Sequence, residues 1–512
     1  MMSFTGFKSA DCGFSLDVSG MSLPAAAVAA LEKRLPAAHA GMVAIEAGEI
    51  KNPDEGRQVT HFSDRLSYLE SDVYAAVEAF AETVRRDESI HNVIINGIGG
   101  SALGPQLLQF AVNGPYWNEL GTDTRKGYPR LYFVDNTDTA GLADAKAVCA
   151  LANTLVVSIS KSGGTQETKN NMIALEQAYA AAGLTFADHA VAITMAGSQL
   201  DQYARANHWR DIFPMAESIG GRTSETNIVG HVPAALAGIH FAEFVEGAKA
   251  MDAMTRVENP AANPAYQLAA CWYIAGAGKG DRAMVVVPYS DRLVLLGKYL
   301  QQLVMESLGK ELDLDGHVVH QGLTVYGNKG GTDAHAYIQQ LNDGRDDFFV
   351  TFIEPLKDAE HIVIGDGLTM GDYLHGFKEG LASALRAKGR QVIDITIDAV
   401  TPRTLGMLIA LYERAVAFYA ELIHINAFHQ PGVQAYKLAS KGVNDISAKL
   451  RGWIAGGAGE FSAAAAAEAA GLGDSTREVA GLLAKFAANA RDFEGHTVKR
   501  AFRDGDWVYQ IG

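Results

Sequence analysis

The chain has 512 residues, a length that favours two or three packed units over a single core. Hydrophobic residues make up 48% of it and charged residues 20%, which is typical of a protein that folds throughout. The formal net charge is −16, so we do not expect nucleic acid as a partner. An acidic chain can still bind a small phosphorylated molecule, because such a site needs only a few N–H donors and one or two cations.

The three cysteines predict neither a disulfide framework nor a zinc site, because Cys12, Cys149 and Cys271 are far apart and odd in number. This favours a reducing compartment. The first residues contain no apolar signal core, and Glu413 and Arg414 interrupt one of the longest apolar stretches well short of a membrane span. We therefore expect a soluble cytoplasmic protein without membrane contact.

The first 88 residues are expected to form a mainly helical N-terminal wrap, since apolar residues recur at helical spacing. After them, short β-branched runs alternate with helical stretches, an order that predicts parallel sheets with helices on both faces. The expected strands are 93–96, 131–134, 154–160, 190–194, 283–289, 348–353, 361–365 and 391–397. The sequence therefore predicts an α/β fold with two tandem doubly wound parallel-sheet domains, at 89–256 and 265–425.

The two α/β domains are expected to meet at 257–264, where two Asn-Pro pairs indicate a loop. The last residues, 426–512, are expected to form a helical C-terminal segment. Within the second domain and this segment we expect helices at 291–310, 404–422, 462–470 and 476–491, and a hairpin near 505–511. The final elements resemble a winged helix in their order, but from Ala455 onward six Lys and Arg residues face eight Asp and Glu residues. A DNA contact is therefore disfavoured, and a covering or subunit-contact role is preferred.

A glycine-rich turn follows the first predicted strand, in the segment Val93–Gln106. Gly97, Gly99 and Gly100 precede Ser101, and such a turn points backbone N–H groups and the positive end of a helix toward an anion. Only the looser form of the dinucleotide fingerprint, ending in alanine, is met. An ordinary tight turn between a strand and a helix explains the glycines equally well.

A second strand, turn and helix carries Ser160, Lys161, Ser162 and Thr165 within six residues. Three hydroxyls and an ammonium beside a helix N-terminus are suited to a phosphate group. An ordinary N-capped turn would account for only one of the hydroxyls. No GxxxxGK[ST] pattern is present, so the segment indicates a sugar-phosphate site rather than a nucleotide site.

Three further segments offer acid–base groups. Gln302, Glu306 and Lys310 have the spacing of one helix face, although a surface Glu–Lys pair would explain two of them. His335 lies in a loop rich in glycine, where a solvated histidine is the alternative. Lys437 lies near the start of a predicted helix, and a solvent-facing lysine is the alternative there.

Six motifs in one order resemble the phosphoglucose isomerases of the SIS-domain superfamily. They are GIGGS, SKSGGTQET, GGR at 220–222, QQLVMESLGK, GTDAHAY and QPGVQAYK, and they span about residues 90 to 440. The resemblance implies an aldose–ketose isomerase of glycolysis and gluconeogenesis. It would interconvert glucose 6-phosphate and fructose 6-phosphate through a cis-enediol(ate), without a metal or another cofactor.

The resemblance also implies roles for single residues. Glu306 would move the proton between C2 and C1, Arg222 would position the sugar and support the developing oxyanion, and His335 with Lys437 would open the sugar ring. The substrate-binding residues would be Gly100, Ser101, Ser160, Lys161, Ser162, Thr165, Gln302 and Gln430. In this family the histidine is typically lent by the other subunit, so a homodimer with a shared active site is implied.

The sequence departs from the family at two places. Gln434 stands where many members have a glutamate, and the Ala-rich segment after Trp453 differs from the usual ending. Whether mannose 6-phosphate is also a substrate stays open, because two epimers differ by the placement of one hydroxyl.

The alternative function is a non-catalytic phosphosugar-binding regulator, but such a protein has no need for Glu306, His335 and Lys437 together. An aminosugar-phosphate synthase would need an N-terminal cysteine, whereas residue 2 is methionine and Cys12 is internal. A metal-dependent isomerase is disfavoured, because the 15 histidines show no ligand spacing beside a carboxylate.

Overall fold

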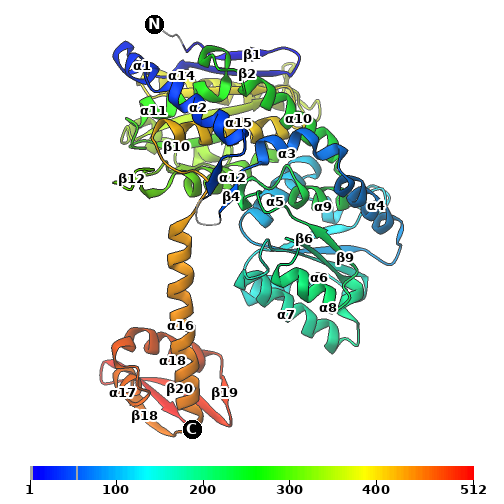
Figure 1. Cartoon of the computed structure of the whole chain (residues 1–512), viewed down its shortest axis with the longest axis vertical. Coiled ribbons are helices and arrows are strands. Elements are labelled where there is room, and N and C mark those ends of the chain that lie inside the picture. Colours follow the sequence, from blue (N-terminus) through cyan, green and yellow to red (C-terminus); the bar gives the residue numbers. More distant parts are fainter. Residues whose placement is uncertain (1–3, 53–55) are drawn as a thin grey trace. The chain divides into compact units, whose positions relative to one another are not determined.

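The computed structural model describes residues 4–52 and 56–512. The chain separates into two compact units, the first ending at His429 and the second running from Gln430 to Gly512. The first unit contains a five-stranded and a six-stranded sheet, each with helices packed on it (Figure 1). Both predicted α/β domains lie inside this unit, and the division of the chain into four domains stays a prediction.

The five-stranded sheet is parallel throughout, in the order β6-β5-β7-β8-β9. Its strands are β5 (Asn92–Asn96), β6 (Arg130–Val134), β7 (Thr154–Ile159), β8 (Ala190–Thr194) and β9 (Asp211–Pro214). Val93 and Ile95 of β5 belong to one hydrophobic core and Ile94 to another on the opposite face. Burial on both faces explains the uninterrupted apolar runs and confirms a doubly wound parallel sheet.

The six-stranded sheet has the order β1-β2-β17-β14-β10-β13. Its strands are β1 (Phe7–Ser9), β2 (Phe14–Gly20), β10 (Ala283–Pro288), β13 (Val325–Tyr326), β14 (Phe348–Pro355) and β17 (Val392–Ile397). The last four are parallel to one another, whereas β2 pairs antiparallel with β17. The predicted helical wrap is therefore wrong for residues 7–20, where β1 and β2 extend this sheet instead.

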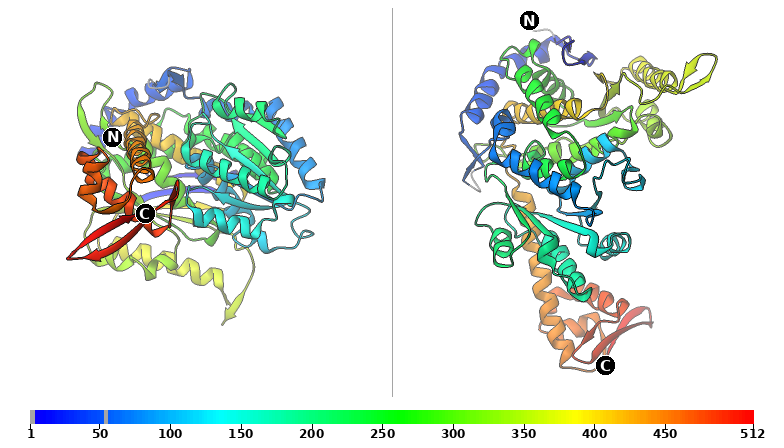
Figure 2. Two further views of the ribbon diagram at one scale, coloured as in Figure 1. Left: turned by 90° about the horizontal axis from the view of Figure 1, so that it is seen from below. Right: turned by 90° about the vertical axis from the view of Figure 1, so that its right-hand side faces the viewer.

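The predicted strand at 361–365 does not join the six-stranded sheet. Its residues form β15 (Val363–Gly365), which pairs antiparallel with β16 (Leu368–Thr369) in a separate hairpin. Figure 2 shows this yellow hairpin standing away from the sheet, and the side chains of Val363 and Ile364 are exposed. The β-branched composition predicted a strand correctly, but it could not identify the partner of that strand.

Helices cover the two sheets of the first unit. They are α1 (Ala25–Glu32), α2 (Leu35–Glu46), α3 (His61–Ser67), α4 (Asp72–Arg86), α5 (Gly100–Asn113), α6 (Thr139–Val148), α7 (Gln166–Ala181), α8 (Gln199–Ala206), α9 (Ile228–Leu236), α10 (Phe241–Thr255), α11 (Pro264–Ala275), α12 (Leu296–Leu300), α13 (Ile338–Asp343), α14 (Met370–Ala387) and α15 (Pro402–Leu422). Helix α15 begins with a Thr401 capping box followed by Pro402, and is buried from Thr404 to Ala420. Among the described residues, no helix has both the length and the apolar content that a membrane span requires.

The segment predicted as one helix at 291–310 is irregular. A 3-10 turn at Asp291–Leu293 leads to α12, which continues as a π-helix over Gln301–Glu306. The helical backbone ends before Lys310, which begins the short strand β11 (Lys310–Leu312). The single regular helix was therefore a wrong prediction, and π-helical turns of this kind are frequently found at functional sites.

The short strands of the first unit form local pairs. These are β3 (Ile50–Asn52) with β4 (Arg57–Gln58), and β11 with β12 (Val318–Gln321). They flank the segments that carry the candidate site and add no strand to either large sheet.

The second unit has a small core of its own, which includes Leu450, Leu483 and Tyr509. Its elements are α16 (Pro431–Ala455), β18 (Gly459–Ser462), α17 (Ala463–Ala469), α18 (Thr476–Ala488), β19 (Asp492–Phe493), β20 (His496–Arg503) and β21 (Asp506–Ile511). Strands β20 and β21 form an antiparallel hairpin. The two predicted helices and the predicted hairpin are therefore confirmed.

Candidate active site

The glycine-rich turn after β5 needs glycine at two positions. Gly99 caps helix α5 with a φ of 60°, a conformation that side chains other than glycine rarely adopt. A Cβ added to Gly100 would lie 1.8 Å from the carbonyl oxygen of Gly221. The glycines therefore allow the start of α5, with Ser101 as its second residue, to lie directly against the segment Gly221–Thr223.

The π-helix lies against the same turn. A Cβ added to Gly99 would lie 3.1 Å from Nε2 of Gln302, so that this side chain rests on the glycine turn. Three segments that are far apart in the sequence thus meet here: the turn after β5, the 3-10 turn that carries Arg222, and the π-helix that carries Glu306. The ordinary tight turn, which was the alternative interpretation, leaves this convergence unexplained.

Glu306 accepts two polar contacts within this cluster. Nε2 of Gln302 donates to its Oε2 at 3.1 Å, and Nη1 of Arg222 lies 3.4 Å from its Oε1. The side chain of Glu306 is 23% exposed, whereas that of Arg222 is only 7% exposed. The arrangement presents one carboxylate that solvent and a ligand can reach, next to a guanidinium that is held by the protein.

The position of Arg222 is fixed by groups other than Glu306. Its Nε donates to the hydroxyl of Ser307 at 2.8 Å, and its Nη2 donates to the backbone carbonyls of Ala427 and His429. The guanidinium therefore keeps its orientation when a ligand approaches Glu306. Ser307 was not predicted as a site residue, and its place next to Glu306 in the motif was the signal that the sequence offered.

Lys310 has a different role from the one that its spacing indicated. Its ammonium donates to the backbone carbonyls of Glu306 and Ser307, at 2.8 and 2.7 Å, and so closes the end of the π-helix. Burial, together with the charge of Arg222, lowers the pKa of Lys310 to about 7. A surface Glu–Lys pair is therefore the wrong explanation, because the lysine is buried and bonds to backbone groups.

The segment predicted to bind phosphate runs from Ser160 to Thr165, and we call it the phosphate cradle. It follows β7, the strand next to β5. The Ser160 hydroxyl donates to that of Thr165 at 3.3 Å, and the N–H of Gly163 donates to Ser160 at 3.1 Å. Ser162 accepts from the N–H of Gly164. Thr165 caps helix α7 without a side-chain bond to the helix backbone, so its hydroxyl is not used as a cap.

Lys161 is the cation of this cradle, and its ammonium donates to the backbone carbonyl of Glu217. The segment that contains Glu217 leads directly into the turn of Arg222. This bond therefore ties the cradle to the neighbouring turn of the candidate site.

The cradle and the glycine turn lie side by side. Strands β5 and β7 pair in parallel with Asn96 opposite Ser158, so both turns emerge from the same edge of the sheet. A Cβ added to Gly97 would lie 3.3 Å from Cβ of Ile159, the residue before Ser160. In open α/β sheets this edge, beyond the carboxyl ends of the strands, is the usual place for ligands.

His335 ends a 3-10 turn (Thr332–His335) and is exposed. The turn is shaped by Asp333, which is buried and accepts from the backbone N–H of Asn328 and from the Tyr337 hydroxyl. Within the described part of the chain, no hydrogen bond joins His335 to Glu306. The role of His335 therefore rests on the family resemblance.

Gln430 and Lys437 belong to the second unit. Gln430 is the N-cap residue of α16, Pro431 is its first residue, and Lys437 lies two turns further along. The predicted helix start at Pro431 is therefore confirmed. The roles of Gln430 and Lys437 rest on the family resemblance.

Comparisons with known proteins place the chain among similar sequences. The phosphoglucose isomerase family model matches residues 44–374. The glucose-6-phosphate isomerase of Geobacter sulfurreducens is 47% identical over 501 residues, which cover 94% of this chain and 93% of that protein. The enzyme of that name from Rippkaea orientalis is 44% identical over 499 residues, with the same coverage.

A solved structure shares the fold. The crystal structure of a glucose-6-phosphate isomerase from Chlamydia trachomatis superposes with a TM-score of 0.77 at 27% identity, covering 86% of this chain and 90% of that one. The family match spans more than half of the residues and includes the glycine turn, the cradle, Arg222 and Glu306. This chain therefore belongs to the phosphoglucose isomerase family.

Proposed function

We propose that this chain interconverts glucose 6-phosphate and fructose 6-phosphate through a cis-enediolate, as an enzyme of glycolysis and gluconeogenesis in the cytoplasm. The observation that carries the proposal is the Glu306 carboxylate, which lies between Gln302 and Arg222 at the ligand-binding edge of the sheet. An aldose–ketose shift needs one carboxylate that reaches two neighbouring carbons and a cation for the oxyanion. Relatives that carry this activity in their names align with 94% of the chain.

Glu306 acts on the opened sugar. Its carboxylate takes the proton from C2, the electrons of that bond form a double bond between C1 and C2, and O1 gains the negative charge. The Arg222 guanidinium stabilises this charge until O1 takes up a proton. The proton on O2 then leaves as the C2 carbonyl forms, and Glu306 returns its proton to C1. Protons and electron pairs balance without any other reactant.

The remaining groups hold the substrate. The phosphate-binding groups that we propose are Gly100, Ser101, Ser160, Lys161, Ser162 and Thr165. Gln302 and Gln430 position the sugar, and Arg222 contacts it as well. The hydroxyls and N–H groups of two adjacent strand ends support this assignment, because together they offer several donors to one phosphate.

His335 and Lys437 open the ring by proton transfer at the ring oxygen and at O1. We propose a homodimer in which each subunit lends His335 to the other, since His335 is exposed while its turn is held rigidly by Asp333. A second feature supports a dimer. Large apolar side chains are exposed on the β15–β16 hairpin and the start of α14, namely Val363, Ile364, Leu368, Met370 and Phe377.

The activity is tested with the wild-type chain and Glu306→Gln in metal-free buffer, by following conversion of glucose 6-phosphate to fructose 6-phosphate. We expect turnover to fall by several orders of magnitude in the variant while substrate binding is largely kept. Glu311→Gln is the matched control, because Glu311 is exposed on the strand that follows. A parent without activity, or a Glu306→Gln enzyme with wild-type turnover, would refute the assignment.

The shared site is tested by mixing subunits of Glu306→Gln with subunits of His335→Gln. If His335 acts across the interface, one site of each mixed dimer has both an intact Glu306 and an intact His335. We therefore expect about half of the wild-type activity per mixed dimer, although each parent variant is nearly inactive. Mixed dimers as inactive as their parents would show that both residues act within one chain.

A further inference from the structure

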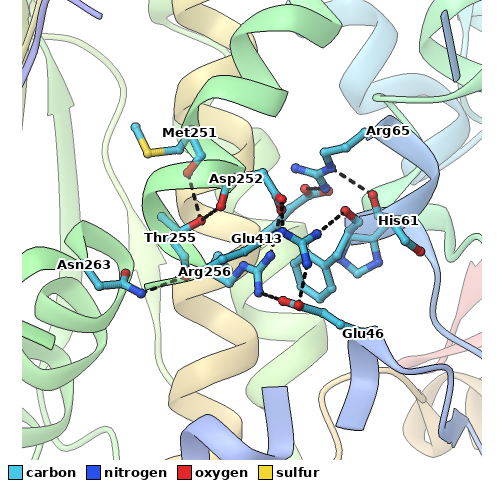
Figure 3. Close-up of polar contacts among 12 residues, drawn as sticks. Glu46, His61, Arg65, Met251, Asp252, Thr255, Arg256, Asn263 and Glu413 are labelled. Atoms are coloured by element: carbon cyan, nitrogen blue, oxygen red, sulfur yellow. Dashed lines mark hydrogen bonds and ion pairs between the residues drawn. The ribbon is translucent and has the colours of Figure 1, made fainter. Parts of the chain in front are cut away.

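A buried cluster of charged side chains lies next to the segments that carry the candidate site. Figure 3 shows Arg65 beside Glu413 and Arg256 beside Glu46, and Arg414 adds a bond of 2.7 Å to Asp252. The three guanidiniums of the cluster, with three carboxylates facing them, are Arg65, Arg256 and Arg414 with Glu46, Asp252 and Glu413. The charges of these six groups balance.

Glu225 is a fourth carboxyl in this cluster and is completely buried. The Tyr299 hydroxyl donates to its Oε1. Among the described residues, no N–H or hydroxyl donor faces its Oε2, and Oε1 of Glu413 likewise has none. The two carboxyls act on each other electrostatically. A proton on one of them would let it donate to the other and would satisfy both oxygens.

The surroundings decide which carboxyl carries the proton. Glu413 pairs through Oε2 with Arg65, a contact that favours its ionised form. Burial and the neighbouring charge of Glu413 raise the pKa of Glu225 well above its ordinary range. With Glu225 neutral, the cluster keeps its balance of charges, whereas an ionised Glu225 would add a fourth carboxylate to three guanidiniums at a buried position.

Glu225 also lies next to elements that adjoin the candidate site. It follows Arg222 by three residues in the chain. Its Cβ would lie 2.7 Å from a Cβ added to Gly104, in the helix that begins at the glycine turn. Its partner Tyr299 belongs to α12, which runs directly into the π-helix of Glu306. The buried side chain of Glu225 therefore connects the segment that carries Arg222 with the helix that leads to Glu306.

We infer that Glu225 is a positioning residue whose neutral carboxyl, by bridging Tyr299 and Glu413, fixes the distance between Arg222 and Glu306. It touches no substrate and transfers no proton in the reaction. The inference on positioning rests on the proposed isomerase activity, whereas the neutral state of the carboxyl does not depend on that activity.

The neutral state is tested by the pH dependence of stability. In the unfolded chain Glu225 loses its proton near its ordinary pKa of 4.5, while the folded chain keeps the proton to a higher pH. The unfolding free energy of the wild type therefore falls as the pH rises through this window, because the folded state binds more protons. The titratable groups that surround Glu225 are Tyr299, Glu413 and Arg65, with Asp252 beyond them.

The variant Glu225→Gln has no such proton to lose, and its amide can donate to Glu413 and accept from Tyr299. We expect its unfolding free energy, relative to the wild type, to increase steadily between pH 5 and pH 8 in urea unfolding experiments. Glu413→Gln is the matched control, and it should be destabilised across this range because Arg65 loses its carboxylate. A Glu225→Gln difference that stays constant with pH would overturn the neutral carboxyl.

Positioning is tested by the separation of kcat from KM. We expect Glu225→Gln to keep kcat within about threefold of the wild type, and Glu225→Leu to lower it about tenfold or more with a smaller change in KM. Tyr299→Phe breaks the same bridge with a smaller perturbation and should lower kcat in the same direction. Together with Glu225→Leu it should show no further loss, because both remove one interaction.

Wild-type kcat in both Glu225→Leu and Tyr299→Phe would overturn the positioning role. If Glu225→Leu does not fold, Tyr299→Phe and the pH profile of Glu225→Gln decide alone. Failure of the proposed function is distinguishable, since the parent chain would then show no turnover while the pH profile of stability is unaffected.

Discussion

Two glutamates, Glu306 and Glu225, lie close to Arg222 in different surroundings. Glu306 is 23% exposed and its carboxylate faces the guanidinium of Arg222 and the amide of Gln302. Glu225 is completely buried and faces a hydroxyl and a second carboxyl. The first has a cation within its ion pair and access to solvent, whereas the second is closed off from solvent and lies next to another carboxyl.

The difference shows that the surroundings of a glutamate side chain decide its function. A general base must be ionised, must be reachable by the substrate and must exchange its proton, and only Glu306 meets these conditions. A carboxyl held neutral in a closed site can instead donate a hydrogen bond that fixes its neighbours.

The largest contrast is expected when both glutamates receive the same substitution. Glu306→Gln should lower kcat by roughly 10³-fold or more, because the base is lost. Glu225→Gln should change kcat only a few-fold, because a neutral group replaces a neutral group. Steady-state assays of the two variants side by side check this. Comparable losses in the two variants would contradict the division of roles.

A smaller loss is expected for Arg222→Lys. A lysine cannot bond to Ser307 and to the Ala427 carbonyl while it also faces Glu306, so the cation loses its fixed orientation. We expect kcat/KM to fall on the order of 10²-fold. Arg205→Lys is the control, since this arginine lies largely exposed on helix α8. Equal activity in both variants would rule out an oriented guanidinium.

Thr165→Val should act mainly on binding. The variant removes one proposed phosphate donor and keeps the shape of the side chain, so we expect KM to rise about tenfold with little change in kcat. Thr185→Val is a suitable control, because Thr185 is exposed at the start of another turn. An unchanged KM would remove Thr165 from the phosphate site.

The smallest effect is expected for Lys310→Met, and it appears in stability. The folded pKa of Lys310 is lowered from 10.5 to about 7, so in this window the unfolded chain binds a proton that the folded chain has lost. Stability of the wild type therefore rises with pH, relative to Lys310→Met, between about pH 7 and 10. Urea midpoints at pH 7 and pH 9 measure this rise, and a constant difference would contradict it.

The strands that build the ligand edge were predictable from the sequence. The runs that became β5 and β7 are buried on both faces, and such burial leaves a continuous β-branched pattern. Glycine and hydroxyl residues directly after them marked the turns. The N-terminal strand β2 was missed, although its residues alternate between buried and exposed, because the helical spacing of the residues after it was extended to the start of the chain.

Other features depend on contacts that no local pattern contains. The hairpin at 363–369 has the composition of an inner strand, and only its pairing shows that it lies outside the large sheet. The π-helix widens the turn before Glu306, so spacing rules for a regular helix placed Lys310 wrongly. The interaction of Glu225 with Glu413 joins residues 188 positions apart, which sequence spacing alone could not reveal.

The account is tested most directly by running the isomerisation in deuterium oxide and locating deuterium in the product by NMR. Because the Glu306 carboxyl is partly exposed, the proton it carries can exchange with solvent before it reaches C1. We predict deuterium at C1 of fructose 6-phosphate with the wild type, and neither exchange nor turnover with Glu306→Gln. Product that forms at the wild-type rate without any solvent deuterium would indicate direct transfer of hydrogen between the carbons and would contradict a carboxylate base.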